Sequence, residues 1–458
     1  MQSGQNFEKL FSQIINKLPQ SDQINSYKIG ILTSFLLVIP FCKINANGLD
    51  ISLSGKSQLI LINVTIISLI IATKLKIKDI TIPSLIPLIM ISLIYFSTSI
   101  NSDLFAKSTE RALITLIPSF LILILIQKIR NIDIFYVGII KSLSYICAFS
   151  VLYAIIGIIY SNNYISTRSY EIIDIQIFGL KLEQIIANRA FYYGNDKFYI
   201  QRHAGILPNP NGLGLLCAII FGFSYNKLLS RRMRNFIRIV SIAGLIISFS
   251  RMGILLFAVT TVYINIKSSN IRQIFTAFCF VIVISFSLAV SSFSATQSHQ
   301  ATFLPTILNH EVFSLGERSQ LLAAAWNGFI NNWLIGVGFG VGSDYLFPDA
   351  SNIKAVHSVF MNSLVETGIF GTFLLTTIWI SPIFISNRSK LRSDNQSNFS
   401  HITAGVLLGL FVAEAFDLSV TRFHYIHLIF VALLGIWLSL RQNANVSETE
   451  DAHSSQTP

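Results

Sequence analysis

A series of long apolar blocks with few charges constrains the fold of this chain more than any other feature. The blocks cover residues 27–43, 58–73, 82–99, 111–127, 134–160, 205–226, 236–250, 253–266, 273–292, 358–385, 401–418 and 424–440. Many of them are long enough to cross a bilayer core of about 30 Å as helices. Only helices and closed barrels satisfy the backbone in lipid, and blocks this continuous indicate helices. The sequence therefore predicts an all-α polytopic membrane protein with about 12 transmembrane helices.

The composition supports this class, because 52% of the residues are hydrophobic and only 12% are charged. Soluble proteins carry about 25% charged residues. These proportions exclude a cytosolic enzyme and a nucleic-acid-binding domain, despite the net charge of +11. The partner that they imply is a lipid bilayer, and no nucleic-acid partner is expected. All four cysteines, Cys42, Cys147, Cys217 and Cys279, lie inside apolar blocks, which predicts buried side chains without disulfides or metal ligands.

The distribution of lysine and arginine predicts the orientation, since cytoplasmic segments carry an excess of both. With a cytoplasmic N-terminus, most of the basic residues fall on the cytoplasmic side, including a cluster at 227–238. The first 26 residues are polar, so the first apolar block is expected to be a retained span and not a cleaved signal peptide. We expect a cytoplasmic segment at 1–26, a transmembrane domain at 27–440 and a disordered cytoplasmic tail at 441–458.

Two segments on the extracytoplasmic side, at about 161–204 and 293–357, are too long for simple turns. In the second segment, apolar residues recur at helical spacing, at Leu322, Trp326, Phe329, Ile330 and Trp333. The first segment shows the same pattern more weakly, at Leu182, Ile185, Ile186, Arg189 and Tyr193. Both patterns predict amphipathic helices in a large, partly helical region, the second of which lies on the outer leaflet or caps the bundle.

Four side chains on the extracytoplasmic side are candidate functional residues. Arg202, Arg251 and Arg318 are candidates for binding phosphate, because a guanidinium is planar, stays charged and binds bidentately. His357 is a candidate general base, since a neutral imidazole accepts protons near neutral pH. Each residue also has a structural interpretation, as an interfacial, turn or surface residue. Their joint position on one side of the membrane favours the functional interpretation.

The surroundings of Arg202 suggest an anion site. Arg202 lies where the first long segment meets the sixth apolar block, in QRHAGILPNPNGLG. Pro208 and Pro210 are expected to break that span near its outer end, and a broken helix directs free backbone N–H groups toward an anion. The structural alternative is a proline kink whose arginine reaches the lipid headgroups.

Two further features have weaker interpretations. The sequence GVGFGVG at 336–342 resembles a phosphate loop, but no βαβ unit surrounds it. A flexible turn that re-enters the bundle is favoured, with N–H groups available to help hold an anion. The last two blocks contain pairs at i,i+3 spacing, Glu414 with Asp417 and His424 with His427. These pairs are either a proton path or a structural group in which Arg422 holds Asp417. No cysteine or histidine cluster has metal-ligand spacing, so no metal or cofactor is expected.

A spaced motif begins at His357. The small polar Ser358 follows, then nine residues, Gly368, two residues and Gly371. This pattern resembles the motif of the O-antigen ligase and O-antigen polymerase superfamily of bacterial envelope glycosyltransferases. Three upstream segments resemble further family segments in the same order: RHAGILPNPNG with Arg202 and Asn211, SFSRMGIL with Arg251, and the stretch from Arg318 to Gly340. The resemblance covers residues 200–380.

The resemblance implies a GT-C-like membrane glycosyltransferase in the bacterial plasma membrane, with both termini cytoplasmic and its active site facing the periplasm. Such enzymes transfer a glycan from a polyprenyl-diphosphate carrier to an acceptor hydroxyl, without a metal or nucleotide sugar. His357 would activate the acceptor, and Arg202 and Arg251 would bind the diphosphate and stabilise the charge that develops on it. Arg318 would share this role or position the loop.

Several acceptors agree with this resemblance. A glycan or lipid A-core acceptor would make the protein a ligase in lipopolysaccharide or surface polysaccharide assembly. A second lipid-linked glycan would make it a polymerase, and a serine or threonine would make it a protein O-oligosaccharyltransferase. The alternative of a different class is a transporter that uses the acid and histidine pairs. A transporter should concentrate its polar groups near the bilayer midplane, whereas the candidate residues here lie at the outer edge.

Overall fold

Helices occupy all of the predicted apolar blocks in the computed structural model. The structure describes residues 20–38, 42, 45–46, 49–50, 55–72, 82–127, 129, 131–161, 170–177, 180–193, 196–266, 268–293, 321–348, 356, 358–386, 394–415 and 426–439. The long helices are α2 (Gln20–Val38), α3 (Gly55–Ala72), α4 (Ile82–Ile100), α5 (Phe105–Gln127), α6 (Ile132–Ser161), α7 (Pro210–Phe223), α8 (Arg231–Ser248), α9 (Arg251–Asn265), α10 (Ser269–Phe293), α13 (Val359–Ser386), α14 (Asp394–Glu414) and Ile426–Ser439. The prediction of a helical bundle is therefore confirmed.

The bundle has the character of a membrane protein. Within the described ranges, three helices are long and apolar enough to cross a membrane, namely Phe105–Gln127, Ile132–Ile159 and Val359–Ile383, and several shorter helices are apolar. Large apolar side chains also face outward, with Leu93 66% and Phe373 72% exposed. Such exposure is unfavourable in water and favourable in lipid. The chain is a multi-pass membrane protein, whereas the number of spans and their orientation stay predictions.

A small antiparallel sheet replaces the helix that the sequence predicts for the first long segment. Its strands are β1 (Asn45–Ala46), β2 (Leu49–Asp50), β3 (Tyr170–Ile177), β4 (Leu180–Tyr193) and β5 (Asp196–His203). Strand β4 pairs with β1, β3 and β5. The prediction of an all-α fold is therefore wrong for this segment, because three extended strands hydrogen-bond side by side where a helix over 182–193 was expected.

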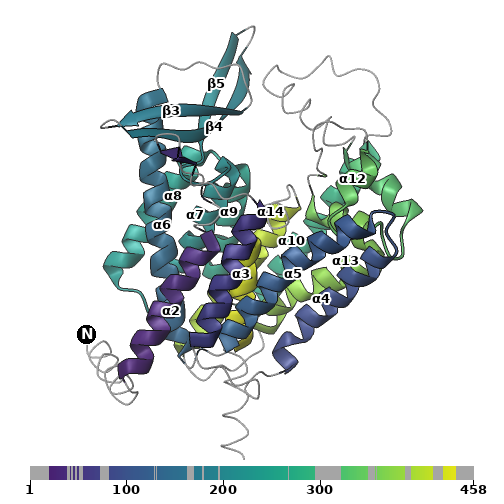
Figure 1. Ribbon diagram of the computed structural model, residues 1–458, viewed down its shortest axis with the longest axis horizontal. Helices are drawn as coiled ribbons and strands as arrows, with labels where there is room; N and C mark the ends of the chain where they lie inside the picture. Colours follow the sequence, from purple (N-terminus) through teal and green to yellow (C-terminus); the bar gives the residue numbers. More distant parts are fainter. Residues whose placement is uncertain are drawn as a thin grey trace, which may run out of the picture.

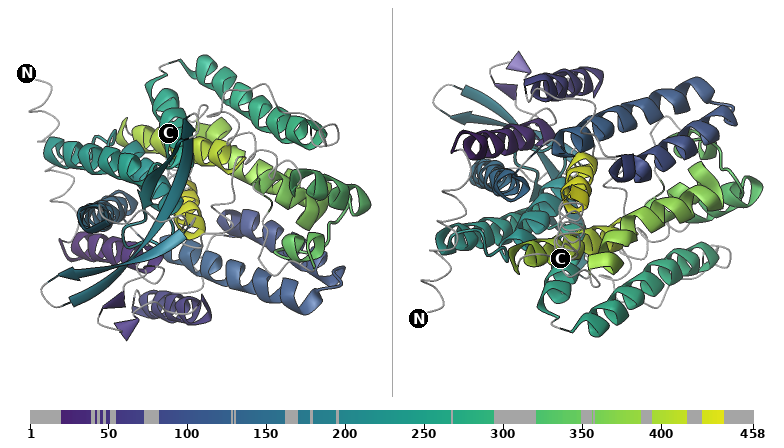
Figure 2. Two further views of the ribbon diagram at one scale, coloured as in Figure 1. Left: turned by 90° about the horizontal axis from the view of Figure 1, so that it is seen from above. Right: turned by 90° about the horizontal axis from the view of Figure 1, so that it is seen from below.

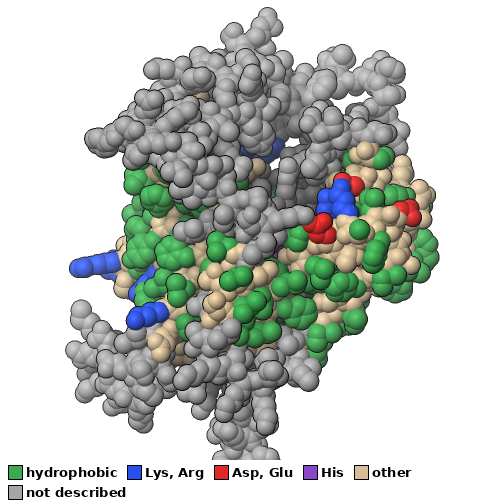
Figure 3. All heavy atoms as spheres, in the orientation of Figure 1, with side chains coloured by type: hydrophobic (Ala, Val, Ile, Leu, Met, Phe, Trp, Pro, Cys, Tyr) green, Lys and Arg blue, Asp and Glu red, His purple; other side chains and the backbone are tan. Residues whose placement is uncertain are grey.

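The sheet marks one end of the bundle, which we call the sheet end. Figure 1 shows β3, β4 and β5 above the helices at this end, with the short helix α12 (Gly342–Leu346) beyond the bundle on the same side. Seen from above and from below, α13 lies between α10 and the pair formed by α4 and α5 (Figure 2). Hydrophobic side chains are spread over the visible face of the bundle (Figure 3).

Close glycine contacts bring α7 and α9 together. A Cβ atom on Gly253 of α9 would lie 2.6 Å from the carbonyl carbon of Gly214 in α7. A Cβ atom on Gly214 would in turn lie 2.3 Å from the Cβ atom of Ser250. Only residues without a side chain allow two helix backbones to approach so closely. This contact fixes the two helix ends that carry Asn211 and Arg251.

The amphipathic helix predicted in the second long segment is confirmed at 321–331. Its buried Leu322 and Ala325 belong to a hydrophobic cluster with Met361 and Val365 of α13. The helix thus packs on the N-terminal part of α13, as expected of a helix that caps the bundle. All four cysteines are buried and free, as predicted.

Candidate functional site

Arg202 is the centre of a hydrogen-bonded group at the sheet end. It lies near the end of β5 and is half-buried. Its Nε atom donates to the Ser248 carbonyl oxygen at 3.0 Å, and its Nη2 atom donates to Asn211 Oδ1. The Ser250 hydroxyl donates to the same Asn211 oxygen at 3.4 Å. The end of β5 and the nearby start of α7 therefore meet the end of α8, which is distant in the sequence, at one guanidinium.

Arg251 lies beside this group. Ser250 is the N-cap of α9, where its hydroxyl accepts from the Gly253 N–H at 3.1 Å. Arg251 is thus the first residue of α9, and it is exposed. Since Ser248 and Ser250 both contact the Arg202 group, the structure brings Arg202, Asn211 and the turn that carries Arg251 together. A helix N-terminus adds partial positive charge to that turn.

The start of α7 corrects one prediction. Pro208 and Pro210 do not interrupt a helix, because α7 begins at Pro210, where a missing N–H costs no hydrogen bond. Asn209 caps the helix and accepts from the Asn211 N–H at 2.7 Å. This N–H is therefore already bonded within the chain, and the proposed broken helix is wrong for this position.

His203 is a group that the sequence interpretation passed over, although it follows Arg202 directly. Its side chain is only 1% exposed, and its Nδ1 atom has no hydrogen-bond partner among the described residues. Burial lowers the pKa of His203 to about 4, because a low-polarity environment disfavours the charged imidazolium. His203 is therefore neutral at physiological pH.

His357 and Arg318 lie outside the described residues, so their placement stays a prediction. Both described neighbours of His357 are buried, Val356 completely and Ser358 at 1% exposure. Ser358 directly precedes α13: its carbonyl oxygen accepts from the Asn362 N–H at 2.9 Å, and its hydroxyl accepts from the Met361 N–H at 3.4 Å. The motif position of Ser358 is thus an N-terminal helix cap.

Gly368, the first glycine of the motif, interrupts α13. Its φ of 63° and ψ of −167° are not helical, and this region is open essentially to glycine alone. In a continuous helix the Ile369 N–H would donate to Val365 and the Phe370 N–H to Glu366. Instead, the Ile369 N–H donates to the Trp333 carbonyl oxygen at 2.8 Å. The second motif glycine, Gly371, packs against Thr367, from whose Cβ atom an added Cβ would lie 2.3 Å away.

The glycine turn at 336–342 satisfies the carbonyl groups that this break leaves open. The Val337 N–H donates to the Val365 carbonyl oxygen at 2.9 Å, and the Gly338 N–H donates to that of Glu366 at 3.0 Å. The Gly342 N–H donates to Glu366 Oε1 at 3.3 Å. These N–H groups are therefore occupied by α13, and the prediction that they help to hold an anion is wrong for these three. The turn re-enters the bundle, as expected.

A charged group that the sequence interpretation missed fastens this turn to α5. Lys107 Nζ contacts Asp344 Oδ1 at 2.7 Å, and Arg111 Nη1 contacts Asp344 Oδ2 at 2.8 Å and also donates to the Gly340 carbonyl oxygen. Burial raises the pKa of the Asp344 carboxyl, but the hydrogen bonds and charges of Lys107 and Arg111 outweigh it and the pKa falls below its ordinary value. Figure 3 shows basic and acidic side chains side by side near α12.

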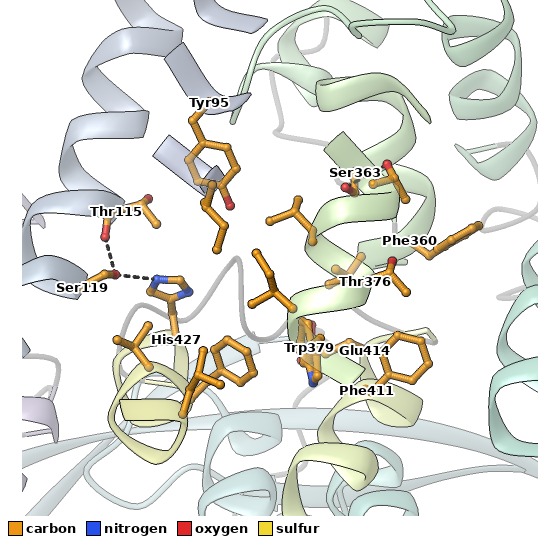
Figure 4. Close-up of a pocket in the computed structure, with 18 of the residues that line it drawn as sticks. Tyr95, Thr115, Ser119, Phe360, Ser363, Thr376, Trp379, Phe411, Glu414 and His427 are labelled. Atoms are coloured by element: carbon orange, nitrogen blue, oxygen red, sulfur yellow. Dashed lines mark hydrogen bonds between the residues drawn. The ribbon is translucent and has the colours of Figure 1, made fainter. Parts of the chain in front are cut away.

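A cavity of about 110 Å³ lies inside the bundle, between α4, α5, α13, α14 and the helix Ile426–Ser439. Its walls are mostly apolar, and Val359 and Phe360, which follow Ser358, belong to them. Its polar lining includes Ser119, His427 and Glu414, the last only 1% exposed. Figure 4 shows the side chain of Ser119, a residue of α5, next to the ring of His427. Since the Ser119 hydroxyl donates to the Thr115 carbonyl oxygen at 2.7 Å, it accepts from His427 Nε2 at 3.1 Å.

The transporter interpretation is tested only in part by this cavity. Glu414 and His427 both line it, whereas Asp417, Arg422 and His424 lie outside the described residues. In the described part of the chain, no group of three or more His, Cys, Asp or Glu residues is arranged to hold a metal ion.

The fold and the site define a class: a multi-pass helical membrane protein with an arginine-centred polar group at one end of its bundle. Residues 236–376 match the family model described as O-antigen ligase. The resemblance expected from the sequence is thereby confirmed for this segment, which runs from α8 into α13 and contains the positions of Arg251, Arg318, His357, Ser358, Gly368 and Gly371. Arg202 and Asn211 precede it. Among curated proteins, none matches this chain.

Proposed function

We propose that the protein is a membrane glycosyltransferase that moves a glycan from a polyprenyl-diphosphate carrier to an acceptor hydroxyl, in the manner of an O-antigen ligase. The observation that carries this proposal is the meeting of Arg202, Asn211 and the Arg251 turn, next to a segment that matches the O-antigen ligase family. An enzyme of this class needs fixed positive charge where a diphosphate leaves, and Arg202 near the end of β5 and Arg251 at the start of α9 supply it.

The course of α8 supports an extracytoplasmic position for this site. The helix begins with Arg231, Arg232 and Arg234 and ends at Ser248, whose carbonyl oxygen accepts from Arg202. The basic cluster and the candidate site therefore lie at opposite ends of one helix. If the cluster faces the cytoplasm, as the excess of basic residues favours, the sheet end faces the periplasm of a bacterial plasma membrane.

The chemistry assigns separate roles to the arginines and the histidine. Breaking the bond between the anomeric carbon and the diphosphate oxygen leaves an anion, which Arg202 and Arg251 stabilise without a proton donor. The acceptor hydroxyl forms the new glycosidic bond and loses its proton to His357. Arg318 binds the diphosphate or positions its loop. No metal or nucleotide sugar takes part in these steps.

The cavity beside α13 suits the lipid part of such a donor. Its walls are apolar, and it begins at Val359 and Phe360, two and three positions after His357. An isoprenoid chain in this cavity would keep its diphosphate near the end of the bundle that carries the candidate residues. In this proposal, the hydrogen bond between Ser119 and His427 has a structural role: it holds the wall of the cavity together.

A transporter is the second candidate function, and the same cavity is the observation that favours it. Glu414 and His427 line a cavity inside the bundle, where a transporter binds its substrate. The two functions differ in which residues they require, since transport would depend on Glu414 and His427, and transfer on His357 and Arg202.

The deciding experiment is the envelope glycan profile of a deletion strain complemented with variants. For a ligase, we expect loss of long-chain lipopolysaccharide with accumulation of lipid-linked polymer. Accumulated single repeat units would indicate a polymerase, and loss of glycan from proteins would indicate a protein O-oligosaccharyltransferase. His357→Ala should reproduce the deletion, while the control His453→Ala, in the polar C-terminal segment, should restore the profile. Normal glycan attachment with His357→Ala would overturn its role.

A further inference from the structure

A small polar pocket opens at the sheet end of α4 and α5, separate from the arginine group. Its volume is about 40 Å³. The residues that line it are Asn101, Ser102, Asp103, Leu104, Asn332, Val337 and Tyr345. It is therefore framed by the turn between α4 and α5, the loop after the helix 321–331, and α12. None of the lining residues is a lysine or arginine, so the pocket does not favour a phosphate.

The polar atoms in this pocket are mainly acceptors. The amide nitrogen of Asn332 donates to the Gly328 carbonyl oxygen at 3.2 Å and to the Tyr345 hydroxyl at 3.1 Å. The Asn101 amide nitrogen donates to the Ser97 carbonyl oxygen at 2.8 Å. Within the described part of the chain, the amide oxygens of both asparagines and the exposed Asp103 carboxylate accept no hydrogen bond. These three acceptor groups can therefore bind a ligand that donates several hydrogen bonds.

An oriented aromatic ring completes the pocket. Tyr345 is 39% exposed, and the hydrogen bond from Asn332 fixes its hydroxyl end. A tyrosine ring presents an apolar face with a polar edge. A sugar ring has the matching character, with C–H groups on its face and hydroxyl donors around its rim. Acceptors beside an aromatic face therefore fit a neutral sugar better than an apolar or anionic ligand.

The surroundings hold this pocket rigidly and join it to the motif helix. The Ser108 hydroxyl donates to the Phe339 carbonyl oxygen at 2.9 Å, and Ser102 lies against Gly338, where a Cβ atom would come within 2.6 Å of its hydroxyl oxygen. Val337, which lines the pocket, donates its N–H to Val365 of α13. A ligand here is therefore bound to the same framework that leads into Ser358.

We propose that the pocket formed by Asn101, Asp103, Asn332 and Tyr345 binds a sugar unit of a glycan substrate. The proposal rests on the proposed function for the identity of that substrate, which is the donor glycan or the acceptor glycan. The hydroxyl groups of the sugar donate hydrogen bonds to the Asp103 carboxylate and to the asparagine amide oxygens. One face of the sugar ring packs against the ring of Tyr345. No bond is made or broken at this site, which positions the glycan for transfer.

The test measures sugar binding without requiring transfer. The full-length protein in lipid nanodiscs is mixed with D-glucose, D-galactose, L-rhamnose or N-acetyl-D-glucosamine, and saturation-transfer NMR reports contact. At least one sugar should bind, and Tyr345→Ala and Asp103→Asn should each weaken its binding about tenfold, as expected for loss of a stacking face or a charged acceptor. Asp103→Asn changes one exposed atom and leaves the fold intact. The control Tyr145→Ala removes an exposed tyrosine of α6 and should bind as the wild type does.

The outcomes separate this proposal from the proposed function. Absence of binding by all four sugars, or unchanged binding in Tyr345→Ala and Asp103→Asn, overturns the pocket even if the enzyme transfers glycans. Binding that depends on these residues in a protein without transferase activity supports the pocket and removes the proposed function. In an active enzyme, a rise in KM for the acceptor with unchanged kcat assigns the pocket to the acceptor, and a rise in KM for the donor assigns it to the donor.

Discussion

The amide oxygen of Asn211 accepts a hydrogen bond from the guanidinium of Arg202, and so joins the start of α7 to the end of β5. The same oxygen accepts from the hydroxyl of Ser250. One nitrogen of Arg202 is used for the Ser248 carbonyl oxygen and another for Asn211. The geometry of a guanidinium is required for both bonds, because its nitrogens are held in one plane at fixed angles.

Arg202→Lys should therefore lower glycan transfer although the charge is retained. An ammonium group is a point charge that cannot reproduce two bonds in one plane, and we expect a loss of about tenfold or more in transfer rate. The measurement is the rate of glycan attachment in membranes. Arg231→Lys, at the opposite end of the bundle, is the matched control and should be fully active. Wild-type activity in Arg202→Lys would show that the residue does not bind the diphosphate.

Gly368→Ala should destabilise the protein. A Cβ atom at this position would lie 2.3 Å from the Leu334 carbonyl oxygen, and the backbone conformation is one that alanine rarely adopts. We expect a loss of about 2–4 kcal/mol in the free energy of unfolding, seen as a lower melting temperature in detergent.

The control for Gly368→Ala is Gly328→Ala in the helix 321–331. There the nearest atom to an added Cβ is the tip of the flexible Leu346 side chain, at 2.7 Å. Alanine has a higher helix propensity than glycine, so this variant should melt near the wild-type temperature. Equal melting temperatures for the two variants would contradict the assigned helix break.

Arg111→Met should cost more stability than Lys107→Met. Both residues pair with Asp344, but Arg111 also donates to the Gly340 carbonyl oxygen. The Lys107 pair is 47% and 28% exposed, so its loss should cost no more than about 0.5 kcal/mol. Loss of Arg111 also removes the hydrogen bond to the Gly340 carbonyl oxygen, which adds about 1 kcal/mol to the loss in the free energy of unfolding. Thermal unfolding of the two variants side by side measures this difference, and a reversed order would refute it.

Acidification should destabilise the protein through His203. The pKa of this residue is about 4 in the folded protein against 6.5 for an ordinary histidine. Between pH 6.5 and pH 4, His203 is protonated in the unfolded chain but stays neutral in the folded protein. The free energy of unfolding therefore decreases as the pH falls from 6.5 toward 4. At pH 5 the decrease from this group is about 2 kcal/mol.

His203→Gln should make the melting temperature less dependent on pH within that window. The comparison is the difference between the melting temperatures at pH 7.5 and pH 5, for the wild type and for the variant. An equally steep decrease in the variant would mean that another group causes it.

The sequence predicted the helices because lipid leaves an apolar chain few other options. The strands were missed because Leu182, Ile185 and Ile186 also fit helical spacing. The alternating pattern in YEIIDIQI and the glycine between β3 and β4 were the available signals for a hairpin. Among the site residues, the meeting of Arg202 with Ser248 brings together residues that are 46 positions apart, which spacing along the chain does not encode.

Glu366 shows a second limit of the sequence interpretation. A carboxylate inside an apolar block is unusual enough to be singled out, yet its partners come from a glycine turn far away along the chain. The N–H groups of that turn were available to an anion as far as the sequence could show. Only the break in α13 explains why two of them donate to the carbonyl oxygens of Val365 and Glu366.

The exchange of backbone partners at Gly368 divides α13 mechanically. The piece that starts at Ser358 is fastened to the turn at 336–342, while the piece beyond Gly371 belongs to the membrane bundle. Gly368 alone joins the two pieces. Tilting the first piece therefore requires rotation only about the φ and ψ torsions of this residue, and the helical hydrogen bonds of the second piece stay intact. The motif is in this respect a joint between the piece that carries Ser358 and the membrane bundle.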